Sequence, residues 1–376
     1  MSNRIYFDNA ATTAIDENVF AAMMPYFTEK FGNPSSIYSY GRETKLAIET
    51  ARKTVARILN AQPSEIFFTS GGSESNNTAI LAAIRDLGCT RIISSVIEHH
   101  AVTHTVEHFE RLGSIRAEYV RILDNGHVDL EHLETLLASS TEKTLVSLMH
   151  ANNEIGNLLD IEAVANLCQK HQAYFHSDTV QTVGHYPIDL NKIPVHFITG
   201  AAHKFHGPKG VGLLYINRNV QIKPFIFGGG QERNMRAGTE NIYGIVGFAK
   251  ALELADANHD QDKAHVFGIK QYMYQQLIDL IPGVGFNGDV MGNSLYTVLS
   301  TNFLQSEKTD MLLMNLDLHH ICASSGSACS SGAEAGSHVI RALNTNPNQL
   351  TIRFSFSKFN TKSEVDQVVK TLIDLI

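Results

Sequence analysis

Short apolar runs alternate with helical segments through most of this chain, and that alternation restricts the fold more than any other feature. From Ile66 onward, helical segments separate most of the strands predicted at residues 66–69, 91–95, 118–122, 145–150, 174–177, 197–199 and 211–216. Strands joined through helices pair in parallel and are covered on both faces. The sequence therefore predicts an α/β protein with a mostly parallel, buried sheet, whose ligands bind beyond the carboxyl ends of the strands.

The 376 residues are enough for two units, each with its own hydrophobic core. A long helix is predicted near residues 252–270, and the segments beyond it have the pattern of a smaller α+β unit. We expect an N-terminal arm (1–15) that packs with the smaller domain, a large domain (16–252) and a small C-terminal domain (253–376).

Charge and cysteine content exclude several classes of protein. The net charge of −8, with no block of Lys or Arg, argues against a nucleic-acid partner. No apolar run approaches the roughly 20 residues of a membrane span, and the N-terminus has no secretory h-region. The four cysteines form neither a disulfide framework nor a CxxC pair, which predicts a reducing, cytoplasmic setting.

Residues 197–211 join an apolar strand to a polar turn that contains His203 and Lys204. A lysine where a strand gives way to a loop can act as a covalent amine catalyst, above all as the Schiff-base lysine for pyridoxal phosphate (PLP). A solvated loop position is the commoner explanation of any single lysine. The residues around it therefore decide between the two.

Asp178 ends the strand before this one, and Gln181 follows one turn later. A carboxylate there can keep a pyridinium nitrogen protonated, although an aspartate that caps a helix is common. One crossover unit separates Asp178 from Lys204, so both are expected at neighbouring strand ends.

Ser70 to Glu74, with Gly72 and Ser73, form a strand-to-helix turn that suits either a phosphate or an ordinary capped helix start, and we weigh the two equally. His99 and His100 begin a later helix, and one of them can stack on a flat cofactor and move protons, with a surface or capping histidine as the alternative.

Two further patterns are less favoured. His203 and His206 are three residues apart, but no carboxylate or third histidine stands at ligand spacing, so no metal is predicted. Residues 283–288 match GxGxxG but follow Ile281-Pro282 rather than a strand, which argues against a dinucleotide site.

Cys329 lies among small polar residues of the kind found in exposed loops, where a thiolate can react. Cys89, Cys168 and Cys322 instead have the apolar context of buried cysteines. Arg353, on a predicted strand, can hold a substrate carboxylate with its two-pronged guanidinium, and a structural salt bridge is the alternative.

Taken together, these residues resemble the cysteine desulfurases of the NifS/IscS type, a branch of the class-V aminotransferases and of the fold-type-I PLP enzymes. The resemblance covers nearly the whole chain, in order. Its matching blocks are residues 6–13, 31–36, 68–77, 98–102, 152–156, 176–181, 203–212, 228–241, 325–331 and 352–355.

The resemblance implies a large domain built on a mainly parallel seven-stranded sheet, a smaller α+β domain and PLP as cofactor. It implies that Lys204 forms the Schiff base, that Asp178 pairs with the pyridine nitrogen, that Gln181 contacts the ring oxygen and that His99 stacks on the ring and moves protons. The other implied site residues are Gly72, Ser73 and His203 for the phosphate, with Thr239 from the partner subunit of a homodimer, Asn153 and Arg353 for the substrate carboxylate, and Cys329 as nucleophile.

The implied reaction converts L-cysteine to L-alanine with a persulfide on Cys329, and the sulfur then passes to an iron–sulfur scaffold or a tRNA-thiolation protein. Two positions depart from the family pattern, because Ala201 stands where serine is frequent and Ser73 where threonine is frequent. The alternatives are a selenocysteine lyase or another PLP-dependent lyase or aminotransferase, a non-catalytic assembly protein, and a nicotinamide oxidoreductase.

Overall fold

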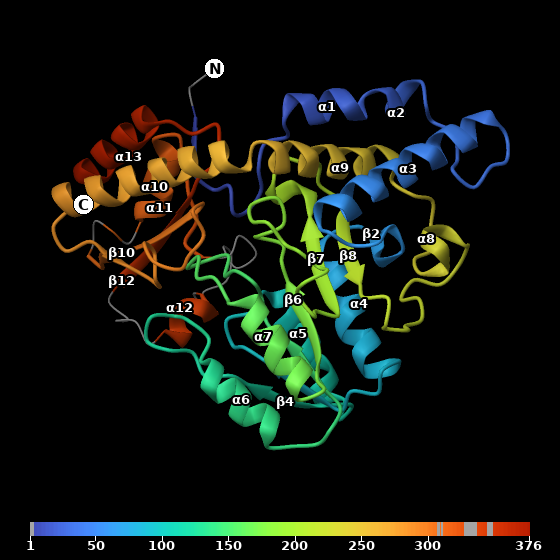
Figure 1. Cartoon of the computed structure of the whole chain (residues 1–376). Coiled ribbons are helices and arrows are strands. Elements are labelled where there is room, and N and C mark those ends of the chain that lie inside the picture. The colour runs from blue at the N-terminus through green and yellow to red at the C-terminus, as the bar shows by residue number, and fades with distance from the viewer. Residues whose placement is uncertain (1–3, 307–308, 310, 327–336, 344–348) are drawn as a thin grey trace.

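The computed structural model describes residues 4–306, 309, 311–326, 337–343 and 349–376. Within these ranges the strands form a seven-stranded, a three-stranded and a two-stranded sheet (Figure 1). No helix in the same ranges combines the length and the apolar character that a membrane span requires.

The seven-stranded sheet forms the centre of the larger unit. Its strands are β2 (Ile66–Thr69), β3 (Arg91–Ser94), β4 (Arg116–Tyr119), β5 (Thr144–Ser147), β6 (Tyr174–Asp178), β7 (Phe197–Ala201) and β8 (Gly212–Ile216). They lie in the order β2-β8-β7-β6-β5-β3-β4, and only β8 runs antiparallel to its neighbours. The predicted mostly parallel sheet, with seven strands, is therefore confirmed.

Helices cover both faces of this sheet because consecutive strand residues point to opposite sides. Ile198 packs in the core on one face, and Phe197 packs in a separate cluster on the other. The first face is covered by α1 (Glu17–Met23), α3 (Ser39–Ile58), α6 (Leu130–Ala138), α7 (Ile161–Lys170) and α9 (Ile242–Ala257). The second face is covered by α4 (Gly72–Arg85) and α5 (His100–Arg111).

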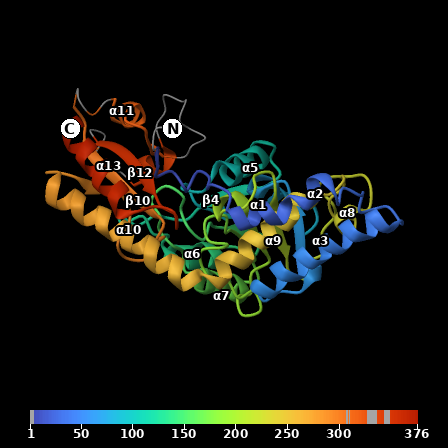
Figure 2. The ribbon, with the colours of Figure 1, turned by 90° about the horizontal axis from the view of Figure 1, so that it is seen from above.

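The C-terminal residues build a second core beside the large sheet (Figures 1 and 2). Its three-stranded antiparallel sheet has the order β12-β10-β9. The elements of this region are α10 (His259–Leu280), β9 (Gly285–Phe286), β10 (Val298–Leu304), α11 (Leu312–Leu318), β11 (Ile321–Cys322), α12 (His338–Ala342), β12 (Gln349–Ser355) and α13 (Lys362–Leu375).

The N-terminal segment leads from this second core to the large sheet. Strand β1 (Ile5–Tyr6) pairs in parallel with β11, and Ile5 and Phe7 are buried in the second core. Residues 10–16 then lie against the turn that follows β7, through main-chain bonds of Thr13 and Asp16. Segments far apart in sequence therefore meet between the two cores.

Two sequence expectations are resolved in this region. The single long helix predicted near residues 252–270 is wrong, because α9 ends and α10 begins at Asn258, whose φ is −110° and ψ 9°. The Asn258 side chain donates to the carbonyl of Leu254 and so stabilises the break. The GxGxxG stretch forms β9, an antiparallel edge strand, which confirms its rejection as a dinucleotide turn.

Candidate active site

A cavity of about 240 Å³ lies beyond the carboxyl ends of β6 and β7. These two strands are neighbours in the sheet, so the predicted approach of Asp178 and Lys204 is confirmed. The predicted site residues that line the cavity are Gly72, Ser73, His99, Asn153, Asp178, Gln181, His203, Lys204 and Arg353. One cavity thus collects side chains from both cores of the molecule.

Lys204 lies in the short turn η2 (Ala202–Lys204), which directly follows the buried strand β7. Its Nζ donates to the main-chain oxygens of Ala10 (2.6 Å) and Ala11 (2.9 Å). Thr13 fixes the turn from the same side, since its main-chain N–H and its hydroxyl both donate to the oxygen of His203, at 2.8 and 3.0 Å. The N-terminal arm therefore positions the lysine, a role that sequence reasoning missed.

Asp178 ends β6 and is only 6% exposed. One carboxylate oxygen accepts from the main-chain N–H of Val180 at 3.0 Å, and the other accepts from Nδ2 of Asn76 at 2.6 Å. Gln181 follows one turn later and donates to the oxygen of Ala10 at 3.0 Å. The carboxylate is thus held in one orientation in a buried setting, as a partner of a ring nitrogen requires.

Asn76 is a second residue of this cavity that sequence reasoning did not single out. Its side-chain oxygen accepts from the hydroxyl of Thr199 (3.0 Å) and from Nε2 of His176 (3.1 Å). Burial lowers the pKa of His176 to about 4, so the ring is neutral at pH 7 and its Nδ1 accepts from Ser147 at 2.8 Å. This network fixes which end of the Asn76 amide faces Asp178.

Gly72 and Ser73 form the first turn of α4 beside the cavity. A Cβ on Gly72 would lie 2.6 Å from Cγ2 of Val180, so a side chain there would collide. Across the cavity, Nδ1 of His203 is 3.2 Å from the hydroxyl of Thr12. Burial, with Lys204 nearby, lowers the pKa of His203 to about 4, which keeps the ring neutral. The cavity thus has helix N–H groups and a neutral imidazole in its lining, and both suit a phosphate.

His99 is both a helix cap and a lining residue of the cavity. Its Nδ1 accepts from the main-chain N–H of Ala101 at 3.1 Å, which places the proton of the neutral ring on Nε2. Burial lowers the pKa of His99 below its ordinary value, despite the opposing charge of Asp178. His99 therefore offers a neutral ring with a single N–H donor.

Arg353 reaches the cavity from β12 of the second core. Nη2 is 2.7 Å from Oδ1 of Asp8, and Nη1 donates to the main-chain oxygen of Asn153 at 2.8 Å. The side chain is 1% exposed, and its Nε has no hydrogen-bond partner among the described residues. Arg353 therefore makes the salt bridge that was its alternative role, and it also lines the cavity.

One predicted residue of the described chain does not line this cavity. Thr239 lines a separate cavity, together with Gly238 and Asn241, and is not among the residues that line the cavity of Lys204. Cys329 lies outside the described residues. Among the residues that are described, no three or more His, Cys, Asp or Glu side chains are grouped so that they could hold a metal ion.

The remaining described cysteines are poor nucleophiles. Burial raises the pKa of Cys89 to about 12 and also raises the pKa of Cys168. Cys322, expected to be buried, is only partly buried on β11, where partial burial again raises the thiol pKa. A raised pKa leaves little thiolate at neutral pH.

The sequence profile of the family described as aminotransferase class-V matches residues 5–368. The chain belongs to this family. A cysteine desulfurase IscS of Dictyoglomus turgidum is 41% identical over 381 residues, which cover 100% of this chain and 95% of that protein. A solved structure described as a NifS-like protein has a TM-score of 0.91 and 37% identity over 99% of this chain and 98% of the other.

A third similar protein is a solved structure described as SspA in complex with cysteine. It has a TM-score of 0.82 and 30% identity, and the match covers 95% of this chain and 100% of that one.

The fold of this chain is that of the class-V aminotransferases. As in the cysteine desulfurases to which it is similar, the cofactor of this enzyme is PLP.

The residues of the cavity fit this cofactor. Lys204 is the only lysine among the described residues that line it, and it shares the cavity with the fixed carboxylate of Asp178 and the neutral ring of His99. The first turn of α4 at Gly72 and Ser73 offers main-chain N–H groups that suit a phosphate, and Arg353 has a buried Nε without a partner among the described residues. Ala201 also lines the cavity, so the hydroxyl missing at that position is missing from this site.

Proposed function

We propose that this class-V aminotransferase is a cysteine desulfurase, which converts L-cysteine to L-alanine and leaves the substrate sulfur as a persulfide on Cys329. The carbon–sulfur bond of cysteine breaks and a sulfur–sulfur bond forms, while the thiol proton of Cys329 balances the new C–H bond of alanine. The observation that carries the proposal is the single cavity that unites Lys204, Asp178 and Arg353. Similar proteins that match its full length are named cysteine desulfurases.

Each residue has a defined task in this proposal. Asp178, Gln181, Gly72, Ser73 and His203 would hold PLP, which supplies an electron sink when the α-proton of the substrate leaves. Lys204 Nζ attaches the cofactor and moves the proton at Cα. His99 donates and accepts a proton at Nε2, and Asn153 and Arg353 orient the substrate carboxylate.

The substitution Arg353→Lys tests the proposed carboxylate site. Lysine keeps the positive charge but loses the planar fork, so one charge-assisted bond to substrate is lost. The KM for L-cysteine should rise by about tenfold to a hundredfold, the equivalent of ~1.5–3 kcal/mol. The absorbance of the bound cofactor should stay at the parent level. Steady-state kinetics and a visible spectrum of the same sample measure both quantities.

Arg116→Lys is the matched control, because Arg116 is largely exposed and pairs with Glu118 and Glu142, away from the cavity. It should leave the KM unchanged. A parent-like KM in the Arg353→Lys variant would remove Arg353 from the substrate site.

We propose that the enzyme is a homodimer whose interface includes an aromatic face of the larger unit. Among its exposed side chains are Ile37, 89% exposed, and Phe227, 76% exposed. The other large apolar side chains exposed in this region are Phe20, Met24, Phe27, Phe31, Tyr38, Tyr40 and Tyr243. Phe27 and Tyr243 stack at a ring-centroid distance of 4.2 Å, which joins α2 (Pro25–Thr28) to α9. Apolar surface of this kind favours a partner.

The position of Thr239 agrees with a dimer. Because Thr239 lines a cavity other than the cofactor cavity of its own chain, a phosphate contact by this residue requires a second copy. The Gly-rich segment 228–241 directly follows Phe227 and leads into α9. We therefore assign Thr239 to the partner's site within this proposal.

The oligomeric state gives a direct test of this face. Light scattering at micromolar concentration should give twice the chain mass of 41.5 kDa. Ile37→Glu should shift the protein toward the monomer, because a buried unpaired charge is costly at an interface. The control Leu318→Glu, at a 68%-exposed site on α11, should leave the mass unchanged. A monomeric parent protein would contradict the dimer.

The proposed division of the chain remains an arm (1–15), a large domain (16–252) and a small domain (253–376). The separate cores, and the burial of Ile5 and Phe7 in the second of them, support it.

We also propose a cytoplasmic enzyme that passes sulfur to an iron–sulfur scaffold or to a tRNA-thiolation protein. The described cysteines are all unpaired, as a reducing compartment would keep them.

A further inference from the structure

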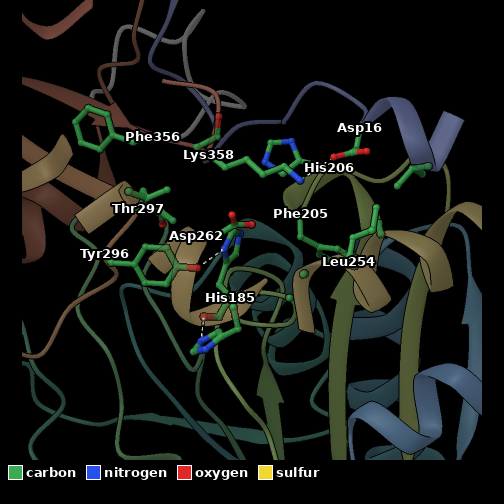
Figure 3. A pocket seen from close by; sticks show the side chains of 17 residues that line it. Asp16, His185, Phe205, His206, Leu254, Asp262, Tyr296, Thr297, Phe356 and Lys358 are labelled. Carbon is green, nitrogen blue, oxygen red and sulfur yellow. Dashed lines mark hydrogen bonds and ion pairs between the residues drawn. The ribbon is translucent and has the colours of Figure 1, made fainter. Parts of the chain in front are cut away.

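The main-chain oxygen of Lys204 is bound by a histidine outside the cofactor cavity. His185 Nε2 lies 3.0 Å from that oxygen, and His185 Nδ1 lies 3.0 Å from the hydroxyl of Tyr296. Figure 3 shows the Tyr296 hydroxyl pointing at the His185 ring. The ring therefore bridges the lysine turn of the larger unit and Tyr296 of the second core.

The partners of the ring determine its protonation. A carbonyl oxygen can only accept, so Nε2 of His185 carries a hydrogen. Burial lowers the pKa of His185, which keeps the ring neutral and makes Nδ1 an acceptor. The hydroxyl of Tyr296 must then donate to it. The two bonds form a directed relay from Tyr296 through His185 to Lys204.

The far end of the relay is tied to the strand that carries Arg353. Tyr296 is buried in the second core and precedes β10, in which Ser300 pairs with Arg353 of β12. The main-chain N–H of Tyr296 also donates to the hydroxyl of Tyr186, at 3.2 Å. A shift of this strand pair would therefore act on the Lys204 turn through His185.

Close packing constrains the main chain beside the ring. Gly184, at φ +80°, lies so near Phe205 that a Cβ would approach its Cγ to 2.6 Å. The ring also lines a small cavity of about 30 Å³ (Figure 3). Beside this cavity Asp16 and Lys358 pair with each other at 2.7 Å, and His259 donates to the His185 main-chain oxygen at 3.1 Å.

We propose that His185 is a positioning residue. It transmits the position of Tyr296 to the lysine turn and so sets Lys204 Nζ relative to a substrate carboxylate held at Arg353. The proposal rests on the proposed function for the identity of the substrate. It assigns the relay no chemical step, because the ring nitrogens lie against the main-chain oxygen of Lys204 and the hydroxyl of Tyr296, and not against Lys204 Nζ. Its effect should appear in the chemical step rather than in substrate binding.

Two substitutions of His185 in the holoenzyme separate the two bonds. The amide nitrogen of glutamine falls near the place of Nε2 and can still donate to Lys204, whereas asparagine reaches only the place of Nδ1. His185→Asn should lower kcat for alanine release by about tenfold or more, since small misplacements of a catalytic group are costly. KM for cysteine should change by less than about twofold, as expected for an interaction that acts on the chemical step.

A spectroscopic readout tests the relay without turnover. The pH at which the absorbance of lysine-bound cofactor changes should be displaced most in His185→Asn. The displacement should be smaller in His185→Gln, which keeps the bond to Lys204 but loses the bond from Tyr296. Tyr296→Phe keeps the aromatic ring and removes only the donor, so it should displace the same pH in the same direction. His265→Asn is the control, because His265 Nε2 donates to a different main-chain oxygen, that of Asn360, at 2.9 Å.

Equal behaviour of the Asn and Gln variants, or a parent-like absorbance titration in both His185→Asn and Tyr296→Phe, would overturn the positioning role. If His185→Asn does not fold, the titration of Tyr296→Phe decides alone. A parent protein that forms no alanine from cysteine would refute the proposed function. The displaced titration would in that case still support the relay.

Discussion

Replacement of Lys204 by alanine is expected to abolish the absorbance of lysine-bound cofactor and to lower alanine formation by about a thousandfold or more. Among the residues that line the described cavity, Lys204 is the only lysine, so no second amine there can take its place. The substitution removes both the covalent attachment and the group that moves the α-proton. A visible spectrum and an alanine assay on the same sample measure the two losses.

Lys209→Ala is the matched control for this experiment. Lys209 lies five residues beyond Lys204, is exposed and is not among the residues that line the cavity. Its removal should leave the spectrum and the rate at parent values. The same melting temperature in both variants would show that loss of the Lys204 bonds to Ala10 and Ala11 has not unfolded the N-terminal arm. A Lys204→Ala protein with parent-like absorbance would contradict the assignment.

Replacement of Cys329 by serine is expected to separate cofactor binding from sulfur transfer. The absorbance of bound cofactor should remain, because the cavity residues that fit PLP are untouched. The persulfide should disappear completely, and alanine formation should fall to background, because a serine hydroxyl does not replace a thiolate toward sulfur. Mass spectrometry of the protein after addition of L-cysteine detects the persulfide.

Cys322→Ser provides the control, because Cys322 is the described cysteine nearest to Cys329 in the sequence. Its thiol is partly buried on β11, and burial raises its pKa, so it should contribute no persulfide. Persulfide formation should therefore be the same in Cys322→Ser and in the parent. Unchanged sulfur release by the Cys329→Ser protein would assign the nucleophile to another group.

Much of the larger unit could be predicted from sequence because its signals are local. Short apolar strands such as 197–199 and 211–216 are bounded by glycine and polar turns, and the structure has β7 and β8 there. The break at Asn258 was missed, because asparagine is tolerated within helices and only the observed bond to Leu254 distinguishes a helix end.

The candidate site was predictable where a residue follows a strand end. Asp178 and Lys204 satisfy that rule, and parallel neighbours bring them together. Asn76 and Asp8 were missed because their roles depend on partners distant in sequence, Asp178 and Arg353. The main-chain oxygens of Ala10 and Ala11 carry no side-chain signal at all. Such contacts arise from tertiary packing, which local patterns do not encode.

The most direct test of the account is a single turnover of the purified holoenzyme with one equivalent of L-cysteine, followed by alanine analysis and peptide mass spectrometry. The account predicts alanine in an amount equal to the sulfur recovered on the peptide that contains Cys329, with the peptides of Cys89, Cys168 and Cys322 unmodified. Alanine formed without sulfur on Cys329, or sulfur recovered on another cysteine, would contradict it.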